Sequence, residues 1–159
     1  MEGTLPPKTQ SGSGYERASV RQFTVFLENR VGKMAFLLNR FEERSLRINA
    51  FSIEESTDIS LMRLIACDCD AARACLREHN FSFSETNVLA VEVPVSDKVP
   101  MIRVAQALLS AEINIHYAYP LMRYDSPPAI AIYVDDLTFA QQVLIRKQFR
   151  ILGETDLRK

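Results

Sequence analysis

The chain has 159 residues, of which 47% are hydrophobic, enough to bury the core of one ordinary domain or of two very small ones. Its 19 basic and 20 acidic residues nearly cancel, and no stretch concentrates Lys or Arg, so the sequence lacks the cationic surface that nucleic-acid binding requires. It also holds no run of about 18 apolar residues and no signal-peptide pattern, so we expect a cytoplasmic protein without a membrane span.

The first 20 residues have almost no apolar periodicity and are expected to form a disordered tail. Apolar residues then alternate from 21 to 27, which predicts a first strand. Apolar residues at helical spacing, from Met34 to Phe41, predict a helix that follows the turn at Gly32.

Two strands are predicted next, over 46–55 and 60–66, joined as a hairpin by a polar turn at 56–58. Asp68 and Asp70 are typical of a helix start, and residues 71–79 are rich in good helix formers. Residues 81–85 alternate again and predict a fourth strand. The order of elements is therefore βαββαβ.

The second half of the chain repeats this order with a spacing of 66 to 68 residues. The repeat aligns Leu27 with Val93, Met34 with Met101, Leu76 with Leu144, Asp68 with Asp136 and Phe81 with Phe149. Duplication explains these matches better than chance, and it predicts two modules, at 21–87 and 88–159. Each module should be an antiparallel sheet with one face covered by helices.

Two short segments carry a resemblance to a known family: the turn at 27–32, which reads Leu-Glu-Asn-Arg-Val-Gly, and Ile-Asn-Ile at 113–115. Together with the repeat they resemble ACT domains. The resemblance implies an α+β fold in which two ferredoxin-like βαββαβ modules pair side by side into an eight-stranded antiparallel sheet with helices on one face. The chain departs from the family at Val31, where proline is common. It departs further in the second turn, 95–100, which is one residue longer and has Val99 about where Gly32 lies.

Physical chemistry connects the first turn to a ligand. Glycine lets a ligand approach the backbone, and the free N–H groups of the first helical turn attract a carboxylate. Asn29 offers a donor and an acceptor, which suits a zwitterion, although an Asx-turn that merely shapes the loop is an equal alternative.

The resemblance implies that the ligand lies between two paired modules and contacts the turn of one and the strand-opening Asn of the other. That Asn is Asn114 in the second module, whereas the first has Arg47 there. We therefore expect one competent composite site and one degenerate site built from Val99, Pro100 and Arg47. The composite site is predicted to comprise Asn29, Arg30, Val31, Gly32, Met34, Asn114 and His116.

His116 follows Asn114 by two and could share its face of the strand, although a histidine bonded to a neighbour is the more frequent situation. Tyr117 and Tyr119 are predicted to share a face with Ile113 and Ile115 and to pack in a core or between modules.

The sequence offers little to catalysis. It has no nucleophile elbow, Walker loop or dinucleotide fingerprint, and only five glycines. Cys67, Cys69, Cys75 and His79 lack the spacing of a structural zinc site, and an odd number of cysteines argues against a disulfide framework. We expect no enzyme activity, no metal and no cofactor.

Three functions are compatible with these features. The first is a stand-alone sensor that binds an amino acid and signals to an enzyme, a transporter or a regulator. The second is a regulatory subunit of a biosynthetic enzyme of the acetolactate synthase or aspartokinase kind. The third is a structural dimerisation module without a ligand. In each case open sheet edges favour a homodimer, and neither nucleic acid nor a membrane is expected as a partner.

Overall fold

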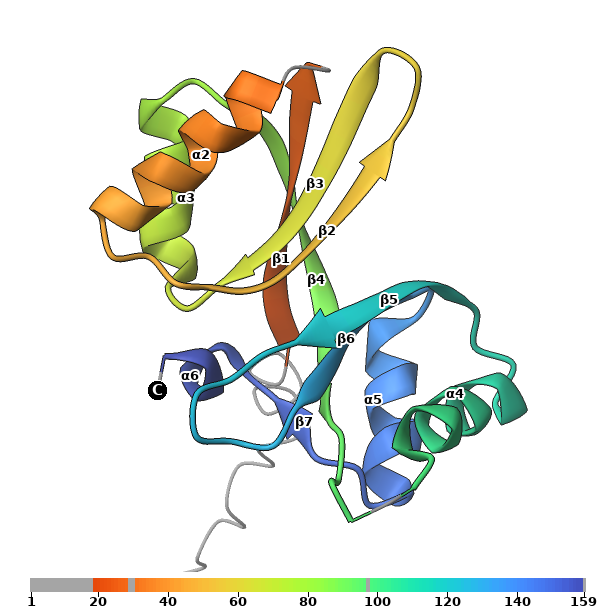
Figure 1. Cartoon of the computed structure of the whole chain (residues 1–159). Helices are drawn as coiled ribbons and strands as arrows, with labels where there is room; N and C mark the ends of the chain where they lie inside the picture. The colour runs from red at the N-terminus through yellow and green to blue at the C-terminus, as the bar shows by residue number, and fades with distance from the viewer. Residues whose placement is uncertain (1–18, 29–30, 97, 159) are drawn as a thin grey trace, which may run out of the picture.

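The computed structural model describes residues 19–28, 31–96 and 98–158, with the backbone alone at Val31. This part of the chain forms one seven-stranded antiparallel sheet and five helices (Figure 1). The strands are β1 (Ser19–Glu28), β2 (Ile48–Glu55), β3 (Ile59–Ala66), β4 (Ser82–Glu92), β5 (Ile115–Leu121), β6 (Ala129–Val134) and β7 (Ile151–Leu152). The helices are α2 (Val31–Glu43), α3 (Cys69–Glu78), α4 (Pro100–Ser110), α5 (Leu137–Arg146) and α6 (Glu154–Leu157).

The α+β content and the predicted order of elements are confirmed, but the sheet has seven strands and not eight. The strand count differs because β4 serves both modules. Its first part pairs with β1, from Ser82 to Leu89, and its last residues pair with β6 and β7. The expected boundary between residues 87 and 88 therefore falls inside β4.

The start of the first module also differs from expectation. Ser19 and Val20, which the sequence assigned to the tail, belong to β1, and Val20 is fully buried. The rest of the predicted tail, 1–18, lies outside the described residues.

Each module has its own core between sheet and helices. In the first module α2 and α3 cover β1 and β3, around Phe23, Leu37 and Leu64. In the second module α4 and α5 cover β4 and β6, around Leu89, Leu108 and Ile132. These cores follow from the alternation along each strand, which places every second side chain on the helix side.

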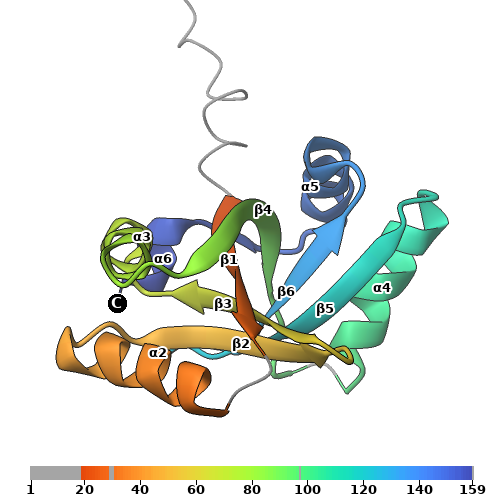
Figure 2. The same cartoon turned by 90° about the horizontal axis from the view of Figure 1, so that it is seen from above.

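A third core forms because the sheet curls and the helix-free surfaces of the two modules meet. It contains Val88, Tyr119 and Leu152. The curl brings β2 next to the end of β5, where the Met122 N–H donates to the Asn49 carbonyl at 2.8 Å. Helices α2 and α3 consequently lie on the opposite side of the molecule from α4 and α5, with the strands between them (Figures 1 and 2).

The backbone repeats its special features from one module to the other. Asp68 and Asp136 both accept a backbone N–H as the N-cap of a helix. The second residue after α3 and the second residue after α5, Asn80 and Gln148, both have positive φ, 57° and 66°. Polar residues tolerate this left-handed conformation where a helix ends.

A β-bulge also recurs, between Ile48 and Ala50 in β2 and between Ile115 and Tyr117 in β5. An extra residue in a strand reverses the alternation that follows it. Ile115 therefore packs on the helix side, while Tyr117 packs between the modules. The prediction that Tyr117 and Tyr119 share a face with Ile115 was wrong for this reason.

Candidate ligand site

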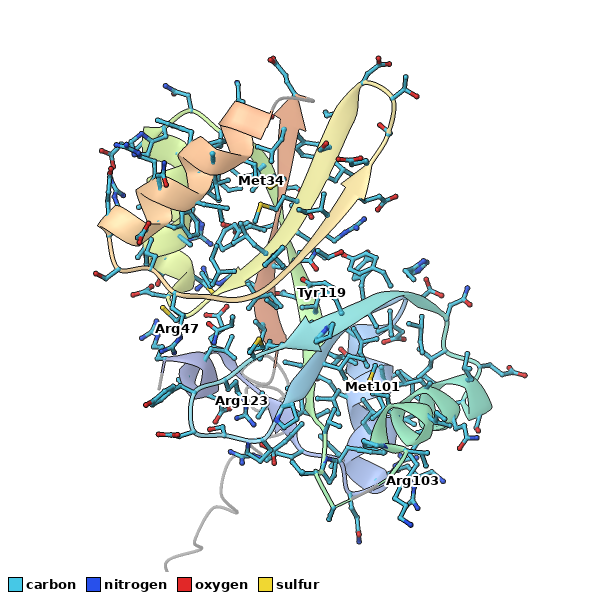
Figure 3. All side chains as sticks on the ribbon, in the orientation of Figure 1. Met34, Arg47, Met101, Arg103, Tyr119 and Arg123 are labelled. Atoms are coloured by element: carbon cyan, nitrogen blue, oxygen red, sulfur yellow. The ribbon has the colours of Figure 1, made fainter. Side chains whose placement is uncertain are left out.

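The first-module part of the predicted site lies at the start of α2. Asn29 and Arg30 fall outside the described residues. Gly32 is in the first turn of α2, and a Cβ added there would meet nothing within 4 Å. The turn is therefore open to a ligand, and packing does not require a glycine. Met34 packs against the first-module core beneath α2 (Figure 3), which is a structural role.

The second-module part lies elsewhere. Asn114 is exposed just before β5, and His116 contacts the Asp135 carboxylate and the Tyr133 ring. The start of α2 and the start of β5 lie well apart in both views of the fold (Figures 1 and 2). Within one chain the structure therefore does not bring Gly32 and Asn114 together.

The residues of the predicted degenerate site are also separated. Val99 is the N-cap residue of α4, and Pro100 is the first residue of that helix. Arg47 is at the other module and donates to the Leu157 carbonyl at 3.0 Å. This contact ties the first module to α6 and gives Arg47 a structural role.

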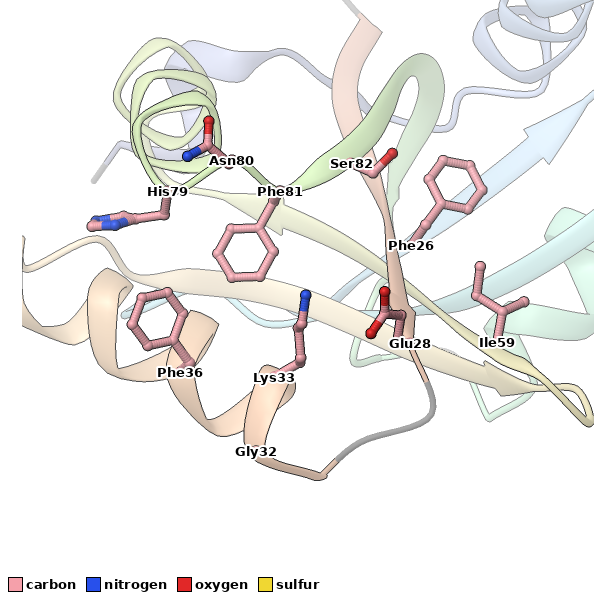
Figure 4. Close-up of a pocket in the computed structure, with 10 residues that line it drawn as sticks. All are labelled: Phe26, Glu28, Gly32, Lys33, Phe36, Ile59, His79, Asn80, Phe81 and Ser82. Atoms are coloured by element: carbon pink, nitrogen blue, oxygen red, sulfur yellow. The ribbon is translucent and has the colours of Figure 1, made fainter.

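A pocket of about 550 Å³ opens beside Gly32 (Figure 4). We call it the first-module pocket, because every residue that lines it belongs to that module. Its apolar lining is formed by Phe26, Phe36, Phe81 and Ile59. Its polar lining includes Glu28, Lys33, His79, Asn80 and Ser82.

The sheet itself creates this opening. The pairing of β1 with β4 ends at Phe26 and Ser82, whereas β1 continues to Glu28 along β3. The pocket lies at this step, between the start of α2 and the residues that follow α3 (Figure 4). The βαββαβ path brings together, at one end of the module, the end of β1, the starts of α2 and β3, and the connection from α3 to β4.

The walls of the pocket are aromatic and incompletely covered. Phe36 lies 6.0 Å from Phe81 and 5.5 Å from His79, measured between ring centroids. The Arg40 guanidinium lies 5.0 Å from the centroid of the Phe36 ring. Phe36 and Phe26 nevertheless remain 43% and 38% exposed. Large apolar side chains exposed around a hollow are typical of a binding surface.

The sequence missed most of the pocket. Phe26 and Phe36 were assigned no role in binding, because each lies within a predicted strand or helix. The one signal was that a phenylalanine occupies the polar side of a strand that otherwise alternates regularly.

A buried polar cluster also went unnoticed, between the modules. The fully buried Gln22 side chain accepts from the Tyr119 hydroxyl at 2.6 Å and contacts the Tyr117 hydroxyl at 2.7 Å. The Arg63 guanidinium lies 4.1 Å from the centroid of the Tyr117 ring. Burial raises the pKa of Tyr119 above its usual value, so the hydroxyl stays a neutral donor. The alternation placed Gln22 on a polar face, which the curl of the sheet then covers.

Within the described residues, no group of three or more His, Cys, Asp or Glu side chains is placed to hold a metal ion. The same part of the chain contains no helix long and apolar enough to cross a membrane. The pocket combines apolar walls with two opposite charges, an arrangement that can bind and orient a small molecule.

A family profile described as an ACT domain pair matches residues 18–159 of this chain. The chain is an ACT domain pair. ACT domains are regulatory ligand-binding modules, and the family as a whole recognises amino acids. No curated protein matches the chain.

Solved structures agree with this ACT pair fold. Protein BT0572 from Bacteroides thetaiotaomicron superposes with a TM-score of 0.80 and 23% sequence identity, covering 89% of this chain and 97% of that one. The ligand-free regulatory subunit of aspartate kinase from Thermus thermophilus superposes with a TM-score of 0.54 and 13% identity, covering 80% and 88%. Its counterpart from Thermus flavus gives 0.51 and 13%, again covering 80% and 88%. Identities this low establish the fold alone.

Proposed function

We propose that this ACT pair is a non-catalytic, cytoplasmic regulatory protein that binds an amino acid and passes the signal to a partner protein. The observation that carries the proposal is the first-module pocket, which opens at the start of α2 beside Gly32. The open first turn of α2 offers backbone N–H groups to a carboxylate, and Lys33 adds a positive charge beside them.

The ligand transmits the signal by shifting the population of the chain between two conformations. A ligand that binds one arrangement of the chain more tightly than another favours that arrangement, by at most its difference in affinity. The two modules share β4 and a common core, so closure of the first-module pocket around a ligand acts on a strand that the second module also uses.

A homodimer is part of the proposal. Strand β2 is at one end of the sheet, and beyond its contact with Met122 at Asn49 it carries Phe51 and Ile53, which are 59% and 41% exposed. Open edges with apolar side chains favour pairing with a second copy. In such a dimer Asn114 of one copy contributes to the ligand site beside Gly32 of the other, as the composite-site hypothesis requires.

The test is a thermal-shift screen of the purified chain against the twenty amino acids, followed by calorimetric titration of those that stabilise it. A ligand at 100 times its dissociation constant should stabilise the chain by roughly 2.7 kcal/mol, a shift of several degrees at this size. Sedimentation with and without the ligand reports the oligomeric state. If no amino acid stabilises the chain, the sensor function is wrong.

The composite site has its own test in Asn114→Ala. If a second copy supplies Asn114, this change should weaken binding about tenfold or more, because it leaves a ligand group without its partner. Unchanged affinity would place the whole site in the first-module pocket.

A second candidate is an obligate regulatory subunit of a biosynthetic enzyme. Outward-facing apolar side chains on α4 favour it, since Ile102 and Leu109 are 54% and 59% exposed and lie two helical turns apart. Copurification of a catalytic chain with the tagged protein, lost in an Ile102→Lys and Leu109→Lys variant, would support this candidate.

A further inference from the structure

We infer that the first-module pocket selects an amino acid with a large apolar side chain, above all an aromatic one, and that each chain has one such site. The inference rests on the proposed function and specifies its ligand. Three observations support it: the aromatic lining of the pocket, the position of its two charged side chains, and the residues that occupy the equivalent positions in the second module.

The walls fit an aromatic ring. Phe36 on α2 and Phe81, just before β4, lie next to one another on the helix side of the pocket, while Phe26 lines it from the other side of β1 (Figure 4). The planes of the Phe36 and Phe81 rings are inclined to one another by 37°. Aromatic rings prefer such tilted or offset neighbours to a face-to-face stack. A ligand ring placed beside Phe36 and Phe81 would remove from water the apolar surface that Phe36 now exposes.

The charges fit a zwitterion. Glu28 at the end of β1 and Lys33 in the first turn of α2 point into the same side of the pocket (Figure 4). A carboxylate and an ammonium group side by side complement the ammonium and carboxylate groups of an α-amino acid. The volume of about 550 Å³ lies within the range of small-molecule pockets and leaves room for a large side chain.

The second module shows what this position looks like without a ligand site. Phe26 lies opposite Leu61 and Ser82. The equivalent Glu92 lies opposite Ala129, and its backbone N–H donates to the Arg150 carbonyl at 2.9 Å. The aromatic wall is therefore replaced by a carboxylate.

That carboxylate closes the position with ion pairs. Glu92 contacts the Arg123 guanidinium at 2.6 Å and the Arg150 guanidinium at 3.3 Å. Phe36 is likewise replaced by Arg103, which projects outward from α4 (Figure 3). Of the three aromatic residues only Phe81 keeps its type, as Phe149 in the second core. The positions of Phe26 and Phe36 thus carry charged residues in the second module.

The experiment is calorimetric titration of the full chain with L-phenylalanine, L-leucine, L-serine, L-lysine and L-aspartate. We expect L-phenylalanine to bind most tightly and L-serine at least about tenfold more weakly. The analogues 3-phenylpropionate and 2-phenylethylamine each lack one of the two charges, and each should bind at least about tenfold more weakly than L-phenylalanine.

Variants locate the site. Phe36→Ala removes a half-exposed ring and Phe26→Glu installs the side chain of the second module, so both should fold and both should weaken L-phenylalanine binding about tenfold or more. The control is Phe149→Ala, which removes the second-module counterpart of Phe81 and should leave the affinity unchanged. Circular dichroism and the unfolding midpoint confirm that each variant is folded.

The possible results distinguish an error in ligand selectivity or site location from an error in the sensor function itself. Binding of L-serine, L-lysine or L-aspartate in preference to L-phenylalanine would overturn the selectivity and leave the sensor function standing. Binding of L-phenylalanine that Phe36→Ala and Phe26→Glu do not weaken would overturn the location. Binding of none of the twenty amino acids would overturn the proposed function together with this inference.

Discussion

Gln22 shows how much one buried side chain contributes to the contact between the modules. Its amide reaches the hydroxyls of Tyr117 and Tyr119, and neither the amide nor Tyr119 is exposed to more than a trace of solvent. A buried polar group that loses its partner costs about 1–3 kcal/mol. Gln22 therefore contributes to stability mainly because its loss would leave the Tyr117 and Tyr119 hydroxyls without their hydrogen-bond partner.

We expect Gln22→Leu to lower the free energy of unfolding by about 1–3 kcal/mol in urea titrations. The control is the triple variant that also carries Tyr117→Phe and Tyr119→Phe. It should recover part of the loss, because an apolar contact of similar shape replaces the whole polar network. Equal losses in the single and triple variants would contradict the role of the hydroxyl contacts.

The three cysteines differ in their exposure. Burial raises the pKa of the Cys69 thiol to about 12 and also raises the pKa of Cys75, whereas Cys67 is half-buried. The thiolate is the reactive form, and a high pKa keeps it scarce near neutral pH. At pH 8 a disulfide reagent should therefore label one thiol rapidly in the native protein and all three in denaturant. Rapid labelling of all three in the folded state would contradict the packing of α3.

Helix α6 is the element that fastens the end of the second module to the first. Glu154 at its start accepts from the Arg21 side chain at 2.6 and 2.9 Å and from the Arg21 backbone at 3.2 Å. Leu157 at its end is buried in the core between the modules. Four residues could not form a stable helix alone, so these contacts hold α6 in place.

The Arg21 contact makes α6 sensitive to acid. The hydrogen bond from Arg21 lowers the pKa of Glu154 below its usual value. The folded state then binds the proton less readily than the unfolded state, so the contact stabilises the chain above the ordinary carboxyl range and is lost as the pH falls below it. Glu154→Gln should destabilise the chain at pH 7, and the difference from wild type should shrink from about pH 5 downward.

Urea titrations over that pH range measure this difference. Glu42→Gln on α2 is a suitable control for the loss of one exposed acidic charge, and it should alter the stability little at any pH. A gap between wild type and Glu154→Gln that stays constant down to pH 3 would show that the ion pair does not hold α6.

The elements could be predicted from the sequence because each one has a local cause. The alternation around Phe23 and Val25 gives β1, and the acidic caps Asp68 and Asp136 mark the starts of two helices. The bulge at Ile115 could not be predicted, since it depends on pairing with β6 rather than on composition. The first-module pocket was also missed, because it depends on where β4 stops pairing with β1.

At the scale of the whole molecule the two modules are expected to unfold together. They share β4, and the core between them includes Val88 and Ala90 from that strand. Loss of one module would expose this core, so partial unfolding is costly.

The chain carries its own reporters for this prediction. All three cysteines lie in the first module, and four of the five tyrosines lie in the second. Tyrosine fluorescence and protection of the buried thiols should therefore give the same urea midpoint. Thiols that become reactive at a lower urea concentration than the fluorescence transition would show that the first module opens alone.

The single long strand that runs through both modules has an evolutionary consequence. Adding or removing one residue within β4 would turn every later side chain to the opposite surface, so Leu89 and Val91 would leave their core while Ala90 entered it. A gene duplication that produced this arrangement therefore made the two copies inseparable. Insertions can be accommodated in their loops or hairpins, but the length of β4 between the two modules has to stay the same.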